Sequence, residues 1–402
     1  MKNTIKFMIG LLAIGLVSCE PEFENAVTDE GFYDAGDADF SNYVALGNSL
    51  TAGYADGALF MSGQKDSYPN IMAQQFSFVG GGDFTQPLTS DDLGGLLLGG
   101  QQILGNRLVL SADENGNPFP APLDGMPTTD VVSSETGPFN NMGVPGAKSY
   151  HLVTPGYGSV AGVANGTANP WYARFATSES STVLADAASL NPTFFSLWIG
   201  NNDILGYATS GGSGVDQTGN LDPSTYGGND ITDPNVFAAA YSAQVDALVA
   251  GGAKGVLLNI PDVTSIPYFT TVPAQSIPLD AATAGAVNAQ FALYNGALGQ
   301  LVAGGFISAE EAAIRAINFV EGINYPIMTD VDLTDVTAIL IGAGLDSETA
   351  ALLGQLRQVK SDDLVVLTAS SALGSVPDPS NPLGIVGVSI PLTNQFVLTS
   401  TE

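Results

Sequence analysis

The sequence is poor in the residues that build disulfides, metal centres and nucleic-acid interfaces. Its 402 residues include one cysteine, Cys19, and one histidine, His151. A single cysteine excludes an intrachain disulfide, and the two residues form no ligand-spaced cluster, so neither a metal nor a cofactor is expected. Lysine and arginine total 10 against 40 acidic residues, which gives a net charge of −30. Such a surface repels phosphate backbones, so nucleic acid is not an expected partner.

The chain starts with an apolar run that is too short to cross a bilayer. This run, Phe7 to Val17, follows Lys2 and Lys6 and falls short of the roughly 20 residues of a transmembrane helix. A basic start, a short apolar run and small residues are typical of a secretory signal. Leu16-Val17-Ser18-Cys19 resembles the bacterial lipobox, although an ordinary signal with a chance cysteine is the alternative. We therefore predict a signal peptide over 1–19 and a membrane anchor through lipidated Cys19, which places the protein in the cell envelope, at the outer membrane or cell surface.

The rest of the chain divides into a tether and a large domain. Residues 20–40 are acidic and show no sustained apolar period, which predicts a flexible tether. Residues 41–402 belong to a chain that is 45% hydrophobic and are numerous enough to bury a large core. We interpret them as one domain with insertions at about 80–138 and 206–233, because loops that long often serve as lids or binding loops.

Buried strands and amphipathic helices alternate along this domain. Three apolar runs end at Gly or Pro, as strands buried on both faces do: 43–46, 194–199 and 255–260. Two segments repeat their apolar residues at helical spacing: 237–248 and 287–301. Ser308 and Glu311 form a capping-box pattern before a helix predicted over Ala312 to Val320. Alternating strands and helices predict an α/β fold with a central parallel sheet.

Three short motifs follow strands in a way that suits acyl-transfer chemistry. In Gly47-Asn48-Ser49-Leu50, a serine hydroxyl at a strand-to-loop turn is exposed on a rigid support, as a nucleophile must be. In Asn141 to Gly146, the glycine lets a backbone N–H approach a ligand closely. In Gly200-Asn201-Asn202-Asp203, an asparagine amide at a strand end can donate to a developing oxyanion. Each motif alone is an ordinary turn.

In this order the motifs resemble blocks one, two and three of the GDSL/SGNH hydrolase family, in lipid-anchored form, over roughly residues 42–267. The resemblance implies a three-layer, flavodoxin-like fold and a serine esterase or lipase that forms an acyl-serine intermediate. It assigns the nucleophile to Ser49. It assigns the oxyanion donors to the N–H groups of Ser49 and Gly146 and to the Asn202 side chain. Lipid, small and carbohydrate acetyl esters are the expected substrates.

Two neighbours of these residues are further candidates for substrate binding. Asn48 stands where the family has an aspartate, and we expect its side chain to hydrogen-bond across the turn. Asp203 follows the oxyanion asparagine directly.

The family's general base is absent from the sequence. It is a histidine in an Asp-x-x-His motif near the C-terminus, and no such motif occurs here. We expect that the sequence is a C-terminally truncated version without the last helix and the base-bearing loop. Three interpretations of His151 stay open: a substitute base, a substrate-facing residue, or a surface or capping residue.

Two functions therefore compete. The first is an esterase that is weakly active in this form. The alternative is a non-catalytic surface lipoprotein that uses a degenerate pocket to bind glycan or lipid, for which binding without turnover would be diagnostic. The sequence does not indicate an oligomeric state.

Overall fold

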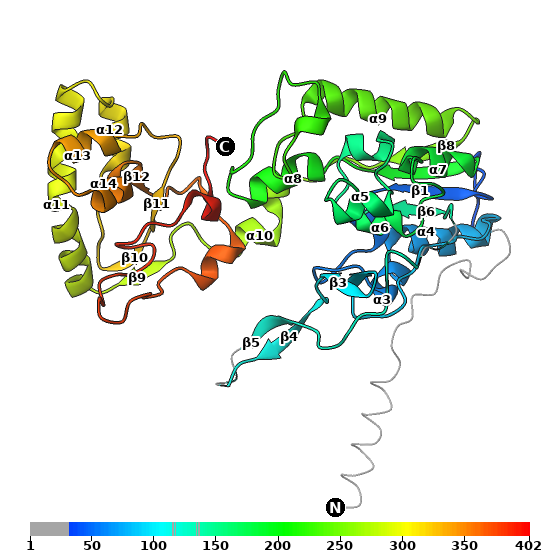
Figure 1. Cartoon of the computed structure of the whole chain (residues 1–402), viewed down its shortest axis with the longest axis horizontal. Helices are drawn as coiled ribbons and strands as arrows, with labels where there is room; N and C mark the ends of the chain where they lie inside the picture. The colour runs from blue at the N-terminus through cyan, green and yellow to red at the C-terminus, as the bar shows by residue number, and fades with distance from the viewer. Residues whose placement is uncertain (1–31, 115, 117, 134, 136) are drawn as a thin grey trace, which may run out of the picture.

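A computed structural model of the chain describes residues 32–114, 116, 118–133, 135 and 137–402. The predicted signal peptide and its lipidation site, Cys19, lie outside the described residues. The chain folds into an N-terminal lobe that contains the parallel sheet and a C-terminal lobe rich in helices (Figure 1). Within the described part, no helix is both long and apolar enough to cross a membrane.

The N-terminal lobe is built on a four-stranded sheet in which all neighbouring strands are parallel. Its strands, in spatial order, are β6 (Asn141–Gly143), β1 (Tyr43–Gly47), β7 (Phe194–Trp198) and β8 (Lys254–Leu257). The register places Gly47 opposite Gly143 on one side and opposite Trp198 on the other. The prediction of an α/β fold with a central parallel sheet is confirmed.

Helices flank the sheet. Those of this lobe are α2 (Ser49–Ala52), α3 (Met61–Lys65), α4 (Tyr68–Phe76), α5 (Val160–Ala164), α6 (Pro170–Ala173), α7 (Val183–Ser189), α8 (Asn202–Thr209) and α9 (Pro234–Val249). Side chains of β1 alternate between two apolar clusters, as a strand's period of two requires. Val44 and Leu46 pack with residues of α7 and α9. Tyr43 and Ala45 pack on the other face with residues of α4.

Helix α9 begins where the sequence predicts. Asp233 accepts hydrogen bonds from the N–H groups of Asn235 and Val236 at 2.7 and 3.1 Å, and Pro234 occupies the first turn. Its apolar face, with Leu248 buried, packs against the sheet. An N-cap aspartate followed by proline is a strong helix start because it satisfies free N–H groups and presets the backbone.

Strand β8 differs from its prediction in length and burial. The predicted run continued to residue 260, but the strand ends at Leu257. It is one of the two edge strands of the sheet, and all four of its residues are exposed, including Val256 at 40% and Leu257 at 52%. The prediction that this strand is buried on both faces is wrong, because an apolar run does not reveal whether a strand lies at the centre or the edge of a sheet.

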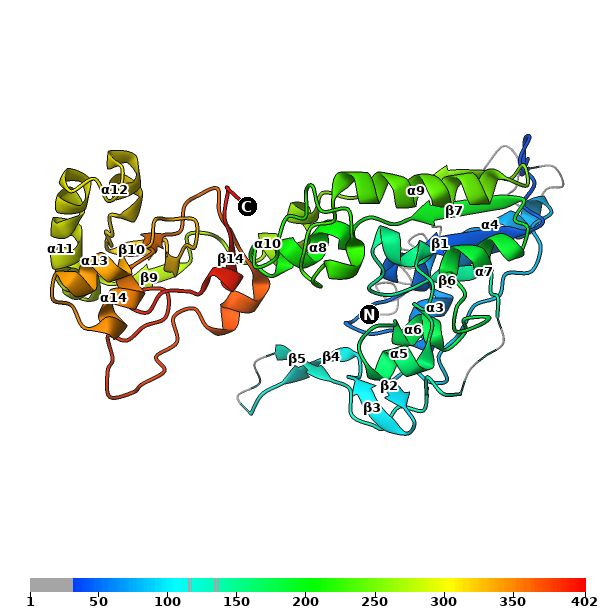
Figure 2. The ribbon, with the colours of Figure 1, turned by 45° about the horizontal axis from the view of Figure 1, so that its top comes forward.

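Two hairpins shape the first predicted insertion. They are β2 (Leu96–Leu98) with β3 (Gln101–Leu104), and β4 (Leu108–Ala112) with β5 (Pro118–Pro122). The β4–β5 hairpin projects away from the lobe in both views (Figure 2). Packing begins well before residue 41, because Tyr33 stacks on Phe78 with ring centroids 5.3 Å apart and Phe40 stacks on Phe76 at 4.0 Å. The described end of the segment predicted as a tether over 20–40 therefore contacts the lobe.

The C-terminal lobe has its own apolar core. Its helices and strands, with the short helix leading into it, are α10 (Pro267–Thr270), β9 (Ile277–Leu279), α11 (Ala281–Ala303), α12 (Ala309–Arg315), β10 (Gly322–Asn324), β11 (Ile327–Thr329), α13 (Thr337–Gly342), α14 (Ser347–Leu353), β12 (Leu356–Gln358), β13 (Leu364–Val365) and β14 (Val397–Leu398). The stripe predicted for α11 is confirmed. Its buried members are Val287, Phe291, Tyr294, Leu298 and Leu301. The predicted single domain therefore holds two lobes, joined by a third cluster that includes Ala208 of α8 and Val397 of β14.

Ser308 caps helix α12 as predicted, but the helix begins at Ala309 and not at Ala312, and it ends early. Ser308 accepts a hydrogen bond from Glu311 N at 3.0 Å, whereas the Glu311 carboxylate pairs with Arg315 at 2.7 Å and does not close the capping box. The helix stops at Arg315 and not at Val320. The next residues lie along α11, where Asn295 accepts from Ile317 N at 2.9 Å. These tertiary hydrogen bonds replace those that further helical turns would have made.

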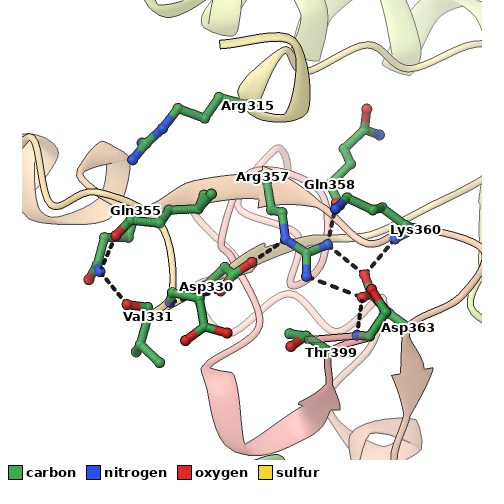
Figure 3. Close-up of polar contacts among 12 residues, drawn as sticks. Arg315, Asp330, Val331, Gln355, Arg357, Gln358, Lys360, Asp363 and Thr399 are labelled. Atoms are coloured by element: carbon green, nitrogen blue, oxygen red, sulfur yellow. Dashed lines mark hydrogen bonds and ion pairs between the residues drawn. The ribbon is translucent and has the colours of Figure 1, made fainter. Parts of the chain in front are cut away.

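A buried ion cluster holds the C-terminal lobe together. Arg357, 1% exposed, lies between Asp330 and Asp363 (Figure 3). Its guanidinium donates to Asp330 and, at 2.5 Å, to Asp363. Asp363 also accepts from the N–H groups of Lys360 and Ser400. Arg357 therefore connects β12 to the segment after β11 and to the turn before β13, and Asp363 adds the segment that follows β14.

Candidate active site

The three motifs of the sequence lie at one edge of the parallel sheet. Because β1, β6 and β7 are parallel neighbours, their carboxyl ends meet at that edge, where ligands bind in open α/β sheets. Ser49 follows β1, Gly146 follows β6 and Asn202 follows β7. The first two segments are joined by a hydrogen bond from Val144 N to Gly47 O at 2.9 Å.

Ser49 begins α2 after a turn that has no room for a side chain. A Cβ on Gly47 would lie 2.2 Å from Thr51 Oγ1 and 2.3 Å from a backbone oxygen of β7. Asn48 is buried, and its side chain accepts from Leu50 N at 3.1 Å, so the expected bond across the turn is confirmed. Ser49 is partly exposed. Among the described residues, none is hydrogen-bonded to its hydroxyl or its N–H, so both groups are free to meet a ligand.

Gly146 has a backbone conformation that favours glycine. Its φ of +80° is left-handed, which a Cβ would strain, although the nearest atom to such a Cβ would be Asn169 Nδ2 at 4.0 Å. The same Nδ2 donates to Pro145 O at 2.8 Å and fixes the loop. The Gly146 N–H donates to no residue in the described ranges. The Gly146 N–H is thus a free donor on a loop that the Asn169 side chain holds in place.

Asn202 starts α8 and reaches back to the loop of the second motif. Its Nδ2 donates to Ala147 O at 2.9 Å. A side-chain amide carries two N–H groups, so one N–H anchors the amide while the other can donate to a ligand. Fixed donors of this kind stabilise developing negative charge well, because they need no reorganisation during reaction.

Asp203 also ties the third motif to the second. Its buried carboxylate accepts from Ser149 N at 2.9 Å and from Ser149 Oγ at 2.7 Å. Burial raises the pKa of Asp203, and the Ser149 hydrogen bonds oppose this rise. The neighbouring Lys148 is buried as well and donates from Nζ to Asp230 O at 2.7 Å. These contacts position the loops, and a role for Asp203 or Asn48 in substrate binding stays a prediction.

His151 has its ring engaged by its own segment. It lies in the 3₁₀ turn Ser149–Val153, where Nδ1 accepts from Lys148 N at 3.0 Å. The ring stacks on Tyr157, with centroids 4.6 Å apart and planes 9° apart. Burial, and then the charge of Lys148, lower the pKa of His151 to about 4. An imidazole that is this weakly basic and bonded through Nδ1 favours the capping interpretation over the general-base interpretation.

The single histidine makes this pKa directly measurable. In an NMR titration of histidine-labelled protein, we expect one imidazole signal with a midpoint near 4, where the ordinary value is 6.5. Between these values the unfolded chain binds the extra proton. The contribution of His151 to the free energy of unfolding is therefore fully present above pH 6.5. It falls by about 3 kcal/mol as the pH drops towards 4.

A non-titrating variant isolates this effect. His151→Asn offers an acceptor near the Nδ1 position but carries no titratable ring. Urea unfolding at pH 7.5 and 4.5 should show a smaller acid loss in the variant than in the parent chain. A midpoint near 6.5, or equal acid losses, would contradict the burial of a neutral imidazole.

A cavity of about 390 Å³ borders the Ser49 helix. Leu50, Tyr54 and Tyr68 line one side, and Arg107 from the first insertion lines another. The Arg107 guanidinium lies 4.6 Å from the centre of the Phe60 ring and donates to Asp92 O at 2.9 Å. The insertion thus forms part of the wall of this cavity, which Leu50, the neighbour of Ser49, lines from α2.

A second cavity, of about 600 Å³, contains His151. Aromatic rings of Tyr150, Tyr157 and Tyr226 line it together with the Asn169 side chain. The Tyr150 and Tyr226 rings meet edge to face, with centroids 5.6 Å apart. Aromatic faces mixed with hydrogen-bonding groups are a common lining for polar organic ligands.

Comparisons of this chain with protein-family models, with curated proteins and with solved structures found no match. The resemblance of the three motifs to the SGNH hydrolases therefore stays a prediction from the sequence.

Sequence reasoning missed the residues that hold this site in shape. Lys148 and Ser149 carry no motif signal. A lysine is expected at the surface, because buried lysines are rare, and an isolated serine is too common to indicate a role. Arg107 was the one residue with a detectable signal. It is one of only 10 basic residues in the chain and lies within a segment predicted to be an insertion.

Proposed function

We propose that this chain is a serine esterase of the SGNH type, with that family's three-layer, flavodoxin-like architecture. The observation that carries the proposal is the placement of Ser49, Gly146 and Asn202 at the carboxyl ends of three neighbouring parallel strands. A free hydroxyl and several free or anchored N–H donors at one sheet edge are the components that acyl transfer requires.

The proposed reaction begins with attack of Ser49 Oγ on an ester carbonyl. The Oγ–carbon bond forms as the carbonyl π electrons move to oxygen, and the N–H groups of Ser49, Gly146 and Asn202 stabilise that oxyanion. The intermediate then expels an alkoxide, which takes up a proton from solvent to become the alcohol, and water attacks the acyl-serine to release the carboxylic acid and restore the Ser49 hydroxyl. Because Nδ1 of His151 is already bonded, the hydroxyl proton goes to solvent, so turnover is slow.

The substrate would occupy the cavity beside α2. Its lining combines the rings of Tyr54, Phe60 and Tyr68 with polar groups of Ser62 and Arg107. A cavity of about 390 Å³ accommodates a small ester and lies near the lower end of the ~300–1,000 Å³ typical of ligand sites. We therefore place small and carbohydrate acetyl esters ahead of long-chain lipids.

Covalent labelling tests the nucleophile. An alkyl fluorophosphonate should form a phosphorus–oxygen bond to Ser49 with loss of fluoride, and mass spectrometry should place the adduct on the peptide that contains Ser49. Ser49→Ala should prevent labelling. Ser180→Ala removes an exposed serine that lines neither candidate cavity and should leave labelling unchanged. An adduct on another serine would contradict the assignment.

A second function is favoured by one specific observation, the engagement of His151 within an aromatic cavity. Without an available imidazole the chain would act as a glycan-binding lipoprotein, with sugar rings packed on Tyr150 or Tyr226. The labelling experiment separates the two functions. The absence of an adduct, combined with saturable binding of a neutral oligosaccharide that is lost in Tyr226→Ala, would place binding ahead of esterase activity.

A further inference from the structure

The C-terminal lobe contains an apolar cavity that plays no part in the proposed esterase site. It has a volume of about 350 Å³ and lies between α11, α13 and α14. Phe291, Tyr294 and Ala297 line it from α11, Leu340 from α13 and Leu353 from α14. The cavity therefore belongs to the core of this lobe, and its occupancy does not depend on Ser49.

The polar groups in this wall are mostly satisfied by the protein itself. The Tyr294 hydroxyl donates to Leu356 O at 3.0 Å. The Ser389 hydroxyl donates to Leu383 O and accepts from Ile385 N at 3.1 Å. Satisfied groups offer little to a polar ligand, because hydrogen bonds already made must be broken to form new ones. The cavity thus favours an apolar occupant.

Charge around the cavity narrows the ligand class further. Among the described residues that line the cavity there is no acid and no base, and burial raises the pKa of the Tyr294 phenol, which stays neutral. Asp346 and Glu348 stand outside the lining at the start of α14, beside the lining residue Thr349. These two carboxylates and a net charge of −30 disfavour an anionic head group at the entrance. A free fatty acid is therefore a poorer fit than an uncharged molecule.

The rim also carries exposed apolar surface. Leu293 is 89% exposed and Leu352 is 44% exposed, and both line the cavity. Exposed apolar side chains around an apolar hollow are typical of ligand-binding sites. The cavity volume of about 350 Å³ suits a small molecule. A protein partner is a poorer fit, because stable protein interfaces bury roughly 800 Å² of surface on each partner.

We propose that this cavity binds an uncharged, medium-chain aliphatic molecule, such as an alcohol or the alkyl arm of a neutral ester. The chain would lie between α11 and α14 with its polar end near Gln290 or Thr349, which also line the cavity. This site shares no lining residue with the cavity beside α2, so binding here and hydrolysis there succeed or fail independently.

The test uses the full chain and a neutral fluorescent probe, Nile red. We expect saturable fluorescence enhancement that 1-decanol competes away and decanoate does not. Ala297→Phe places a ring in the cavity and should weaken probe binding by about tenfold or more. Ala292→Phe, at an exposed position on the same helix that does not line the cavity, is the matched control and should bind like the parent chain.

A second variant guards against misfolding. Thr349→Trp fills the cavity from the opposite wall at an exposed position and should also weaken binding while the thermal midpoint stays close to that of the parent. Equal binding in the filled variants and the control would overturn the proposal. Equal competition by decanoate would overturn the preference for an uncharged ligand.

Discussion

Replacing Asn202 by alanine is expected to lower kcat for p-nitrophenyl acetate by about 10²- to 10³-fold, while KM changes little. The amide of Asn202 is anchored to Ala147 O at 2.9 Å, so its other N–H is held in one direction. A donor that meets the oxygen only when negative charge develops stabilises the transition state more than the substrate. Its loss therefore appears in kcat. Initial rates over a range of substrate concentrations measure both constants.

A control separates this effect from a change in the fold. Asn165 is exposed and donates to Ala161 O at 3.2 Å, so Asn165→Ala removes a comparable side chain and carbonyl contact at a position that lines neither candidate cavity. It should keep the parent kcat. If Asn202→Ala keeps it as well, Asn202 is not an oxyanion donor. A rise in KM with an unchanged kcat would reassign the residue to ground-state binding.

Replacing Arg357 by methionine is expected to destabilise the protein by about 3–5 kcal/mol. The guanidinium lies between two carboxylates, Asp330 and Asp363, which are 5% and 2% exposed. Methionine has a similar length but leaves both carboxylates buried without a cation, and desolvated charge is expensive. Urea unfolding measures the loss. Hydrogen exchange should show that backbone amides of the C-terminal lobe lose protection first, because this lobe has its own apolar core.

A compensating variant distinguishes lost charge pairing from lost packing. Asp330→Asn and Asp363→Asn, added to Arg357→Met, remove the uncompensated charges and leave similar shapes. We expect this triple variant to recover much of the stability, because replacing a whole buried ion cluster is far less harmful than removing one partner. If the triple variant is as unstable as Arg357→Met, shape and not charge is the main contribution of Arg357.

The parts of the fold that could be predicted from sequence are those in which local and tertiary preferences agree. Helix α9 has an aspartate cap and a first-turn proline, and α11 repeats its apolar residues on one face. Burial of β8 could not be predicted, since its apolar run is compatible with a central or an edge strand. The early end of α12 depends on hydrogen bonds to Asn288 and Asn295 of another helix, which no local pattern encodes.

The candidate site divides in the same way. Ser49, Gly146 and Asn202 could be proposed because each follows a strand, and parallel neighbours place their ends together. The contacts that support these residues could not be predicted, because they join segments far apart in sequence. Asp203 binds Ser149 across 54 positions, and Gln244 Nε2 donates to Ser149 O across 95. Such pairings depend on how loops pack, which the order of motifs does not determine.

The hydrogen bond between Asn202 and Ala147 also has an entropic consequence. A free asparagine side chain samples several rotamers, and restricting it to one of them loses conformational entropy. In this chain the rotamer is selected during folding by a backbone carbonyl, before any ligand is present. A molecule that arrives at the sheet edge therefore meets a donor whose direction is already set. Its binding free energy is not reduced by ordering that side chain.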